Sequence, residues 1–262
     1  MLRGKIGVAM ARNARGSGAM EQARAVADKL GAIYIDRPHN HGVEDVLAAN
    51  NLVALIVLEK SGPRIHSAAG AFAYHPGMAA IRVQQLVRGS ADNFVKAMAI
   101  QKGFRVLDCT LGLASDAAVA AFVVGGAGQV VGLEASPLLH FAVTYGLLHY
   151  ETKAPLLNAA LRRIKTINIL AEDYLKTCTC DSFDAVYFDP MFRRPVEGSV
   201  AMEALRPLSF DEPLSKKTVE LALKAAPRVV IKERSEELLA SYGCTEFFGG
   251  KYSRVKYGIL RR

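Results

Sequence analysis

The chain has 262 residues, 51% of them hydrophobic and 22% charged, with a formal net charge of +8 at pH 7. This composition excludes an intrinsically disordered chain. Because the apolar runs fall short of the roughly 18 residues of a membrane span and no signal-peptide core is present, we expect a soluble cytoplasmic protein without a membrane partner. The positive charge favours a polyanionic partner such as nucleic acid, although many basic proteins bind none.

Residues 1–89 are predicted to form a small α/β domain, because strand-like and helix-like segments alternate along them. We expect strands at 5–10, 32–38 and 52–59, and helices at 20–31, with Gly31 as C-cap, and at 43–50. Glycine and proline residues predict turns over 59–70, and a helix is expected from near Pro76 to Gly89. The domain boundary is placed after residue 89, and we expect this domain to take part in substrate docking.

Residues 90–262 are predicted to form a second domain, in which strands again alternate with helices. Strand-like runs are centred on 104–110, 129–136, 166–170, 185–190 and 228–233, and two more form a hairpin around Gly249 and Gly250. This order predicts a doubly wound, mostly parallel sheet with an antiparallel edge. In such folds, ligands bind at the carboxyl ends of the strands.

The first of these strands ends at Asp108, with Gly112 in the turn that follows and a helix beginning near Ser115 and Asp116. A glycine there lets the backbone approach a ligand, and the start of a helix supplies N–H donors. Alanines fill the other two glycine positions of a dinucleotide fingerprint, which counts against NAD or FAD. The Asp108 carboxylate would also repel a pyrophosphate, so we expect a ligand that carries an ammonium group.

Two further acidic positions follow the next strands. Glu134 ends the second strand, where a carboxylate is the usual acceptor for ribose hydroxyls. Glu172 and Asp173 follow the third strand-like run, where an acid suits the exocyclic amine of adenine. Each acid alone is as readily a helix cap or a solvated loop charge, Asp116 being the clearest cap candidate. Together they describe S-adenosyl-L-methionine.

The fourth strand delivers the tetrapeptide "DPMF", which runs from Asp189 and Pro190 to Phe192. Amino-directed methyltransferases acting on bases carry [Asp/Asn]-Pro-Pro-[Tyr/Phe/Trp] here, and DPMF resembles that motif. An exocyclic amine is a poor nucleophile, so Asp189 and a backbone carbonyl fixed by Pro190 would accept and orient its N–H groups. Phe192 would stack on the flipped-out base. The alternative is an Asp-Pro turn that simply ends a strand.

The segments that carry this pattern resemble the RsmJ-like (YhiQ/YpiP) family of S-adenosylmethionine-dependent methyltransferases over most of residues 70–262. They read "AYHPGMAAIRVQQLVRG", "VLDCTLGLASDA", "GLEASP", "FDPMF", "RVVIKE" and "SRVKYGIL". The characterised branch of that family methylates N2 of a guanosine in 16S ribosomal RNA. The chain reads "GLASDA" where that branch favours G-L-G-R-D-A and lacks its lysine-rich segment after DPMF, so it is closer to the Gram-positive branch.

The resemblance implies a class I methyltransferase fold, with a Rossmann-like doubly wound sheet, and ribosomal RNA or the small ribosomal subunit as partner. It also implies cofactor contacts, which fall at Ser115, Asp116, Glu134, Ala135, Glu172, Asp173 and Asp189.

Basic residues near the tetrapeptide are candidates for RNA contacts. Arg193 and Arg194 follow it directly and would neutralise phosphates beside the base. Weaker candidates, for which a solvated surface charge is the commoner explanation, are Arg12, Arg15, Arg162, Arg163 and Lys165. Lys232 would be costly if buried unpaired, so we expect it at the rim of the site. The cysteines contain no CxxC pair, and we predict reduced thiols and no metal site.

The sequence therefore predicts an enzyme that transfers a methyl group to an exocyclic base amine, guanine N2 of 16S ribosomal RNA being the first choice. An amino-methyltransferase acting on tRNA, DNA or a protein glutamine is the alternative within enzymes. A non-catalytic RNA-binding factor that keeps the cofactor fold is a second alternative, and a nicotinamide-dependent reductase a third. The oligomeric state is left open.

Overall fold

The computed structural model describes residues 4–14, 16, 18–37, 40–190, 213–250 and 255–262. Within this part the chain divides into two compact units, the first holding the residues up to His75 together with Ser136–His149, and the second the remainder. In the described ranges no helix has the length and apolarity that crossing a membrane requires.

The sheet of the first unit has the strand order β2-β1-β3-β4-β5. Its strands are β1 (Lys5–Met10), β2 (Ile33–Tyr34), β3 (Leu52–Glu59), β4 (Gly62–Ser67) and β5 (Gly70–Ala73). The first three pair in parallel, whereas β3, β4 and β5 pair antiparallel. Helices α1 (Ala19–Leu30) and α2 (Val43–Ala49) follow β1 and β2, as predicted, and Gly31 is the C-cap of α1.

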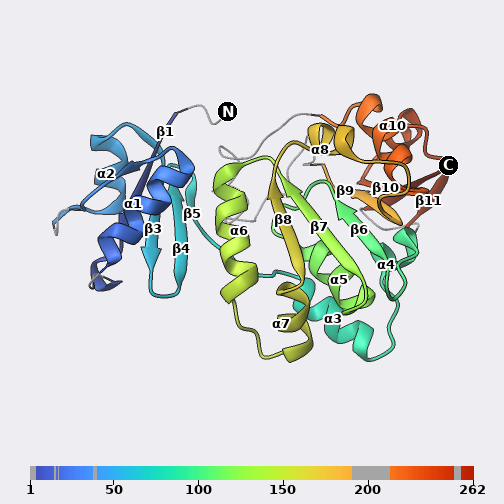
Figure 1. Ribbon diagram of the computed structural model, residues 1–262, viewed down its shortest axis with the longest axis horizontal. Helices are drawn as coiled ribbons and strands as arrows, with labels where there is room; N and C mark the ends of the chain where they lie inside the picture. Colours follow the sequence, from blue (N-terminus) through green and yellow to red (C-terminus); the bar gives the residue numbers. More distant parts are fainter. Residues whose placement is uncertain (1–3, 15, 17, 38–39, 191–212, 251–254) are drawn as a thin grey trace. The chain divides into compact units, whose positions relative to one another are not determined.

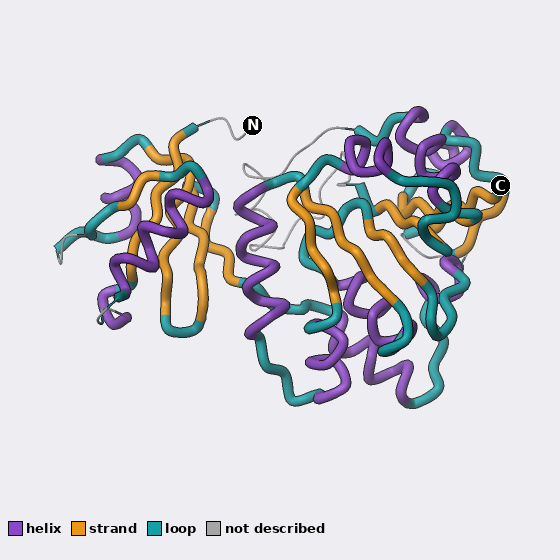
Figure 2. The backbone as a smooth tube through the Cα atoms, in the orientation of Figure 1, coloured by secondary structure: helices purple, strands orange, loops and turns teal. Residues whose placement is uncertain are grey.

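The prediction of turns over 59–70 holds only at 60–61 and 68–69, and it is wrong for the residues between them, which form β4. Figure 2 shows β3 and β4 as the two arms of one hairpin. The buried side chains of Ile65 and Phe72 supply the apolar surface that holds these strands. Pro63 is tolerated because β5 pairs only with the part of β4 that begins at Arg64.

The boundary predicted after residue 89 is also wrong. Helix α3 (Ala79–Val87) contacts α5 (Ser115–Val124), so it belongs with the second unit. Helix α6 (Pro137–His149), which we placed in the second domain, belongs with the first unit. The physical reason is a close approach, since Gly146 of α6 leaves the space that the Tyr74 ring fills.

The sheet of the second unit has the strand order β11-β12-β10-β9-β6-β7-β8. Its strands are β6 (Arg105–Asp108), β7 (Gln129–Glu134), β8 (Ile164–Asn168), β9 (Ala185–Phe188), β10 (Arg228–Glu233), β11 (Glu246–Phe248) and β12 (Lys256–Arg261). Strand β12 is antiparallel to β10 and β11, and the other pairs are parallel. The predicted class I, Rossmann-like doubly wound sheet with a C-terminal hairpin is therefore confirmed.

Helices cover both faces of this sheet (Figure 1). One face carries α8 (Ala171–Thr177), α10 (Lys216–Ala225) and α11 (Glu236–Ser241) around an apolar core that includes Phe188 and Ile231. The other carries α4 (Asn93–Met98) and α5, with α3 and α7 (Pro155–Leu161) packed on α5. Because successive side chains of a strand alternate between faces, Tyr187 points to the second face, where its ring contacts Phe94 edge-on.

The two central strands fix where a ligand can bind. From β6 the chain proceeds to β7 and β8 on one side, and then crosses to β9 and β10 on the other. In doubly wound sheets ligands bind where this order reverses, which here is at the carboxyl ends of β6 and β9. Asp108 ends β6 and Asp189 directly follows β9, so the fold places both at this switch point.

Replacing Gly146 by alanine tests the packing of α6 in the first unit. A Cβ there would lie 2.1 Å from Cγ and Cδ1 of Tyr74, so Gly146→Ala should destabilise the protein by about 1–3 kcal/mol. Where no such contact exists, replacing a glycine inside a helix by alanine stabilises a protein by about 0.5–1 kcal/mol. The sign of the change therefore shows whether Tyr74 fills this space. Urea unfolding followed by circular dichroism measures it. Gly126→Ala, with nothing within 4 Å, is the control, and a stabilised Gly146→Ala protein would refute the packing.

Candidate active site

Thr110 links the ends of the two central strands. Its backbone N–H donates to Asp108 Oδ1 at 3.0 Å, and its Oγ1 accepts from the N–H of Asp189 at 2.6 Å. The same hydroxyl lies 3.5 Å from Asp108 Oδ1. A single side chain therefore sets the spacing of the two aspartates. Sequence reasoning missed Thr110, although a threonine two residues after a strand-end aspartate is typical of an Asx turn.

Glu134 and the turn after β6 hold each other in place. The Gly112 N–H donates to Glu134 Oε2 at 3.1 Å, and Gly112 has φ +50°, in the region that favours glycine. Behind it, Asn168 Nδ2 donates to the carbonyl oxygens of Glu134 (2.7 Å) and Ala135 (3.2 Å). The buried Glu134 is thus fixed at both its side chain and its backbone. Asn168 is a second residue that the sequence did not reveal.

Asp116 is the centre of a buried ion-pair cluster rather than a helix cap. The N-cap of α5 is Ala114, in a left-handed conformation. The Asp116 carboxylate instead accepts from Arg82 Nη1 at 2.5 Å and from the Tyr187 hydroxyl at 2.9 Å. Lys232 Nζ lies 3.4 Å from it. The alternative that Asp116 only caps this helix is therefore wrong, and its side chain joins α3, α5, β9 and β10.

Lys232 connects this cluster to Asp189. Its Nζ donates to Asp189 Oδ2 at 2.7 Å, and its side chain is 20% exposed. The sequence placed Lys232 at the rim, whereas the structure pairs it with two carboxylates inside. At the other end, Arg82 forms an ion pair with Asp92, which caps α4 by accepting from the Val95 N–H. We call Arg82, Asp92, Asp116, Asp189 and Lys232 the ion-pair cluster.

Carboxylates outnumber cations in this region, because Asp108 adds a fourth to the three of the cluster, against Arg82 and Lys232. Burial raises the pKa of Asp108 to about 8. Burial also raises the pKa of Asp189 to about 6, against the opposing effect of Lys232. For Asp116, the attraction of Lys232 and Arg82 outweighs burial and lowers the pKa. The site therefore has an excess of negative charge, which a cationic ligand would neutralise.

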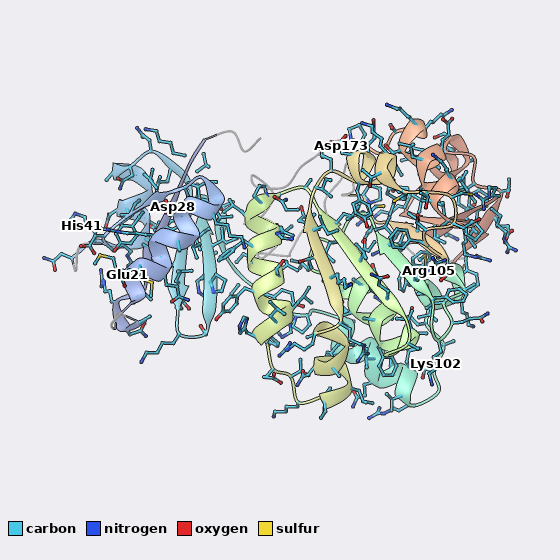
Figure 3. The ribbon with its side chains drawn as sticks, in the orientation of Figure 1. Glu21, Asp28, His41, Lys102, Arg105 and Asp173 are labelled. Atoms are coloured by element: carbon cyan, nitrogen blue, oxygen red, sulfur yellow. The ribbon has the colours of Figure 1, made fainter. Side chains whose placement is uncertain are left out.

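The side chains of three predicted cofactor residues bind other groups of the protein. The Ser115 hydroxyl donates to the Pro76 carbonyl at 3.2 Å, which ties the start of α5 to the segment before α3. Glu172 accepts from Lys217 at 2.8 Å, and this hydrogen bond, with a second from Lys176, lowers its pKa to about 2. Asp173 pairs with Lys176 at 2.8 Å. Figure 3 shows Asp173 at the end of the sheet where the strands finish, opposite Lys102.

Several predicted RNA contacts fall outside the described residues, namely Phe192, Arg193, Arg194 and Arg15. Of the others, Arg162 donates to the Tyr150 carbonyl and Arg163 to the Ala121 carbonyl. Arg12 donates to the His41 carbonyl at 2.7 Å. These three arginines hold backbone in place, and Lys165 of β8 is exposed. An RNA contact for any of them stays a prediction.

Comparison with known proteins identifies related chains. Residues 55–254 match the model of a family described as "Putative SAM-dependent methyltransferase". The chain is 37% identical over 213 residues to a Bacillus subtilis (strain 168) protein named "Uncharacterized protein YpiP", a match that covers 81% of this chain and 82% of that one. Its fold is similar to that of the SAM-dependent methyltransferase NGO1261 from Neisseria gonorrhoeae, with a TM-score of 0.64 at 17% identity over 97% of this chain and 95% of that chain.

Asp108→Asn should make stability less dependent on pH. The folded-state pKa of about 8 lies above the unfolded value, so the folded protein binds more protons, and this stability is lost as the pH rises from about 4 through 8. In the wild-type protein this group changes the free energy of unfolding by up to about 1.4 kcal/mol per pH unit, and the variant should lack this contribution. Urea unfolding at several pH values measures the difference. Asparagine keeps the Oδ1 acceptor for Thr110.

Asp92→Asn is a matched control, for which the dependence of stability on pH has the opposite sign. Burial raises the pKa of Asp92, but its hydrogen bond with Arg82 dominates and lowers it. Its contribution is therefore present at neutral pH and lost in acid, so Asp92→Asn should lower stability most above pH 4. An Asp108→Asn protein that keeps the wild-type pH slope would show that Asp108 is ionised in the folded state.

Proposed function

The chain belongs to the family of S-adenosylmethionine-dependent methyltransferases, and from this premise we propose that it methylates an exocyclic amine of a nucleobase, guanine N2 of 16S ribosomal RNA being the best candidate. One observation carries the proposal. The Asp189 carboxylate, an acceptor for amine N–H groups, is held by Lys232 at the carboxyl end of β9, beside β6, and the backbone N–H of Asp189 donates to Thr110.

The residues at the ends of β6 and β7 fit S-adenosylmethionine, which when bound supplies a methyl group on a positively charged sulfur. Asp108 is a carboxylate whose pKa burial raises, and an ammonium group beside it would offset the cost of ionising it there. The Glu134 carboxylate, which accepts from the Gly112 N–H, stands at the end of β7, where a carboxylate is the usual acceptor for ribose hydroxyls. Gly112 allows close approach of the backbone, and the turn provides no dinucleotide fingerprint.

The remaining predicted cofactor residues take different places in the proposal. We assign Ala135 and the backbone at Ser115 to the rim of the cofactor site, because the structure fixes both segments by hydrogen bonds. Asp116 supports the site through its ion pairs. Glu172 and Asp173 stay predictions for the adenine side, where a ligand would compete with their lysine partners.

Asp189 gives the proposed substrate its orientation. An exocyclic amine conjugated with a ring has two N–H groups, and accepting one at Asp189 and the other at a backbone carbonyl fixed by Pro190 turns the nitrogen lone pair towards the methyl group. Because its pKa is raised towards 6, Asp189 is also suited to take up the proton that the amine releases on methylation. Stacking by Phe192 and phosphate contacts by Arg193 and Arg194 complete the proposal from the sequence alone.

Deletion of the gene should remove N2-methylguanosine from the small-subunit ribosomal RNA of the source organism. Nucleoside mass spectrometry measures it, on RNA from the deletion strain and from strains complemented with wild type or Asp189→Ala. Wild type should restore the nucleoside, and Asp189→Ala should leave less than about a hundredth of it, because the amine loses its acceptor. Glu246→Gln, on the exposed strand β11, is the control that should restore it fully.

The outcomes separate the alternatives. If small-subunit RNA keeps all its N2-methylguanosine on deletion, the proposed nucleotide is wrong, and the tRNA, DNA and protein digests from the same cells identify the other amino substrates. If Asp189→Ala complements as well as wild type does, the role of Asp189 is wrong even when the substrate is right.

Binding of S-adenosylhomocysteine, which retains the ammonium group, should release up to about one proton per site at pH 7, because the ammonium lowers the pKa of Asp108 from about 8. Isothermal titration calorimetry in buffers of different ionisation enthalpy measures this release. Asp108→Asn should bind more weakly and release none, and NADH should not bind. Binding of NADH without binding of the homocysteine would overturn the cofactor assignment.

A further inference from the structure

We propose that Lys232 is a positioning residue for methyl transfer, whose ammonium group fixes one oxygen of Asp189 and keeps that carboxylate able to accept the amine N–H groups of the substrate. This inference rests on the proposed function. It assigns a role to a residue that the sequence reading placed at the rim of the site.

The register of the sheet places the two side chains together. Ile231 of β10 pairs with Phe188 of β9 in a parallel ladder, and both side chains belong to the apolar core on one face. The next residue along each strand therefore points to the opposite face. These residues are Lys232 and Asp189, and their Nζ and Oδ2 atoms are 2.7 Å apart. The contact thus follows from the pairing of β9 with β10.

Lys232 is itself held from behind by Asp116. That carboxylate lies 3.4 Å from Nζ, and Arg82 and the Tyr187 hydroxyl fix its position. The ammonium group consequently has two anionic partners, one in the α5 helix and one at the substrate end of β9. Burial lowers the pKa of Lys232, but the attraction of both carboxylates outweighs it, so the group stays charged.

The charge of Lys232 decides what Asp189 can do. A carboxylate accepts hydrogen bonds at both oxygens, whereas a protonated carboxyl group donates at one of them. With Oδ2 held by Lys232, the ionised group has its other oxygen for an amine N–H. Burial favours the protonated form, and Lys232 opposes it. Without the lysine, a larger fraction of Asp189 would be protonated at neutral pH, and the protonated group has one oxygen fewer to accept an amine N–H.

Several charged or titratable groups face Asp189 besides Lys232, and each contributes to its titration. They are Asp116 of α5, Glu233 of β10, Asp108 of β6 and Tyr187 of β9. All of these are neutral or negative, so they raise the pKa of Asp189 or leave it in place. Lys232 is the cation in contact with Asp189 among the described residues. Removal of this lysine should therefore raise the pKa of Asp189.

The test compares Lys232→Met and Lys232→Arg with wild type, with Lys102→Met, an exposed lysine before β6, as the control. The first measurement is the pKa of Asp189 by carbon-13 NMR on protein labelled at aspartate carboxyls, with Asp189→Asn identifying the signal. We expect Lys232→Met to raise this pKa by at least one unit and Lys232→Arg to keep it near wild type. An unchanged pKa in Lys232→Met would overturn the inference.

The second measurement is methyl transfer to small-subunit RNA as a function of pH. Lys232→Met should lower kcat at least tenfold at pH 7, leave KM for the cofactor within twofold, and recover part of kcat as the pH rises to 9. Lys232→Arg should retain most of kcat. A loss that is constant with pH would mean that Lys232 only supports the fold.

The two measurements test different parts of the proposal. A wild-type protein that methylates no RNA refutes the proposed substrate, while the NMR titration still decides whether Lys232 sets the charge of Asp189. If Lys232→Met does not fold, Lys232→Gln takes its place in the titration, because it removes the charge and keeps a polar side chain, and an unchanged pKa of Asp189 in that variant would again overturn the inference.

Discussion

The buried carboxylate of Asp116 is the constraint on which the second unit depends. Ionised and with only 11% of its side chain exposed, it is tolerated because Arg82, Lys232 and Tyr187 surround it. Removing one member of such a group leaves an uncompensated buried charge, which typically costs 3–5 kcal/mol. The pairs therefore fix α3, α5, β9 and β10 against one another. They also explain why α3 belongs to the second unit, although the sequence reading assigned it to the first.

Thr110 connects the end of β6, which carries Asp108, with the end of β9, which carries Asp189. Its N–H and hydroxyl are shared between Asp108 and Asp189, so the two aspartates cannot move apart independently. Charge joins them as well, since both carboxylates belong to a region in which anions exceed cations. Neutralising one with a bound cation makes ionisation of the other less costly. Under the proposed function, binding of the cofactor at Asp108 would therefore favour the ionised form of Asp189.

The sequence predicted much of this architecture because local patterns encode it. Alternation of strands and helices identified the doubly wound sheet, and strand ends located Asp108, Glu134 and Asp189. Contacts between distant residues were beyond local patterns, since Arg82 meets Asp116 only when the helices are docked. Lys232 illustrates the same limit, because its partner depends on which strand lies beside β10. The segment 59–70 failed for another reason, since glycine and proline were interpreted as turns where pairing to β3 makes a strand.

The position of β12 has a consequence for how the sheet assembles while the chain is being synthesised. This strand follows all the others of its sheet in the described chain, yet it lies between β10 and β11, with Tyr257 opposite Lys232. Until it is synthesised, the edge of β10 away from β9 is open, and Lys232 lies on an edge strand. A nascent chain that has passed residue 233 but has not reached 261 therefore has every acid of the site on a sheet that still lacks its antiparallel strand. Lys232 therefore acquires its second neighbouring strand only after β12 has been synthesised.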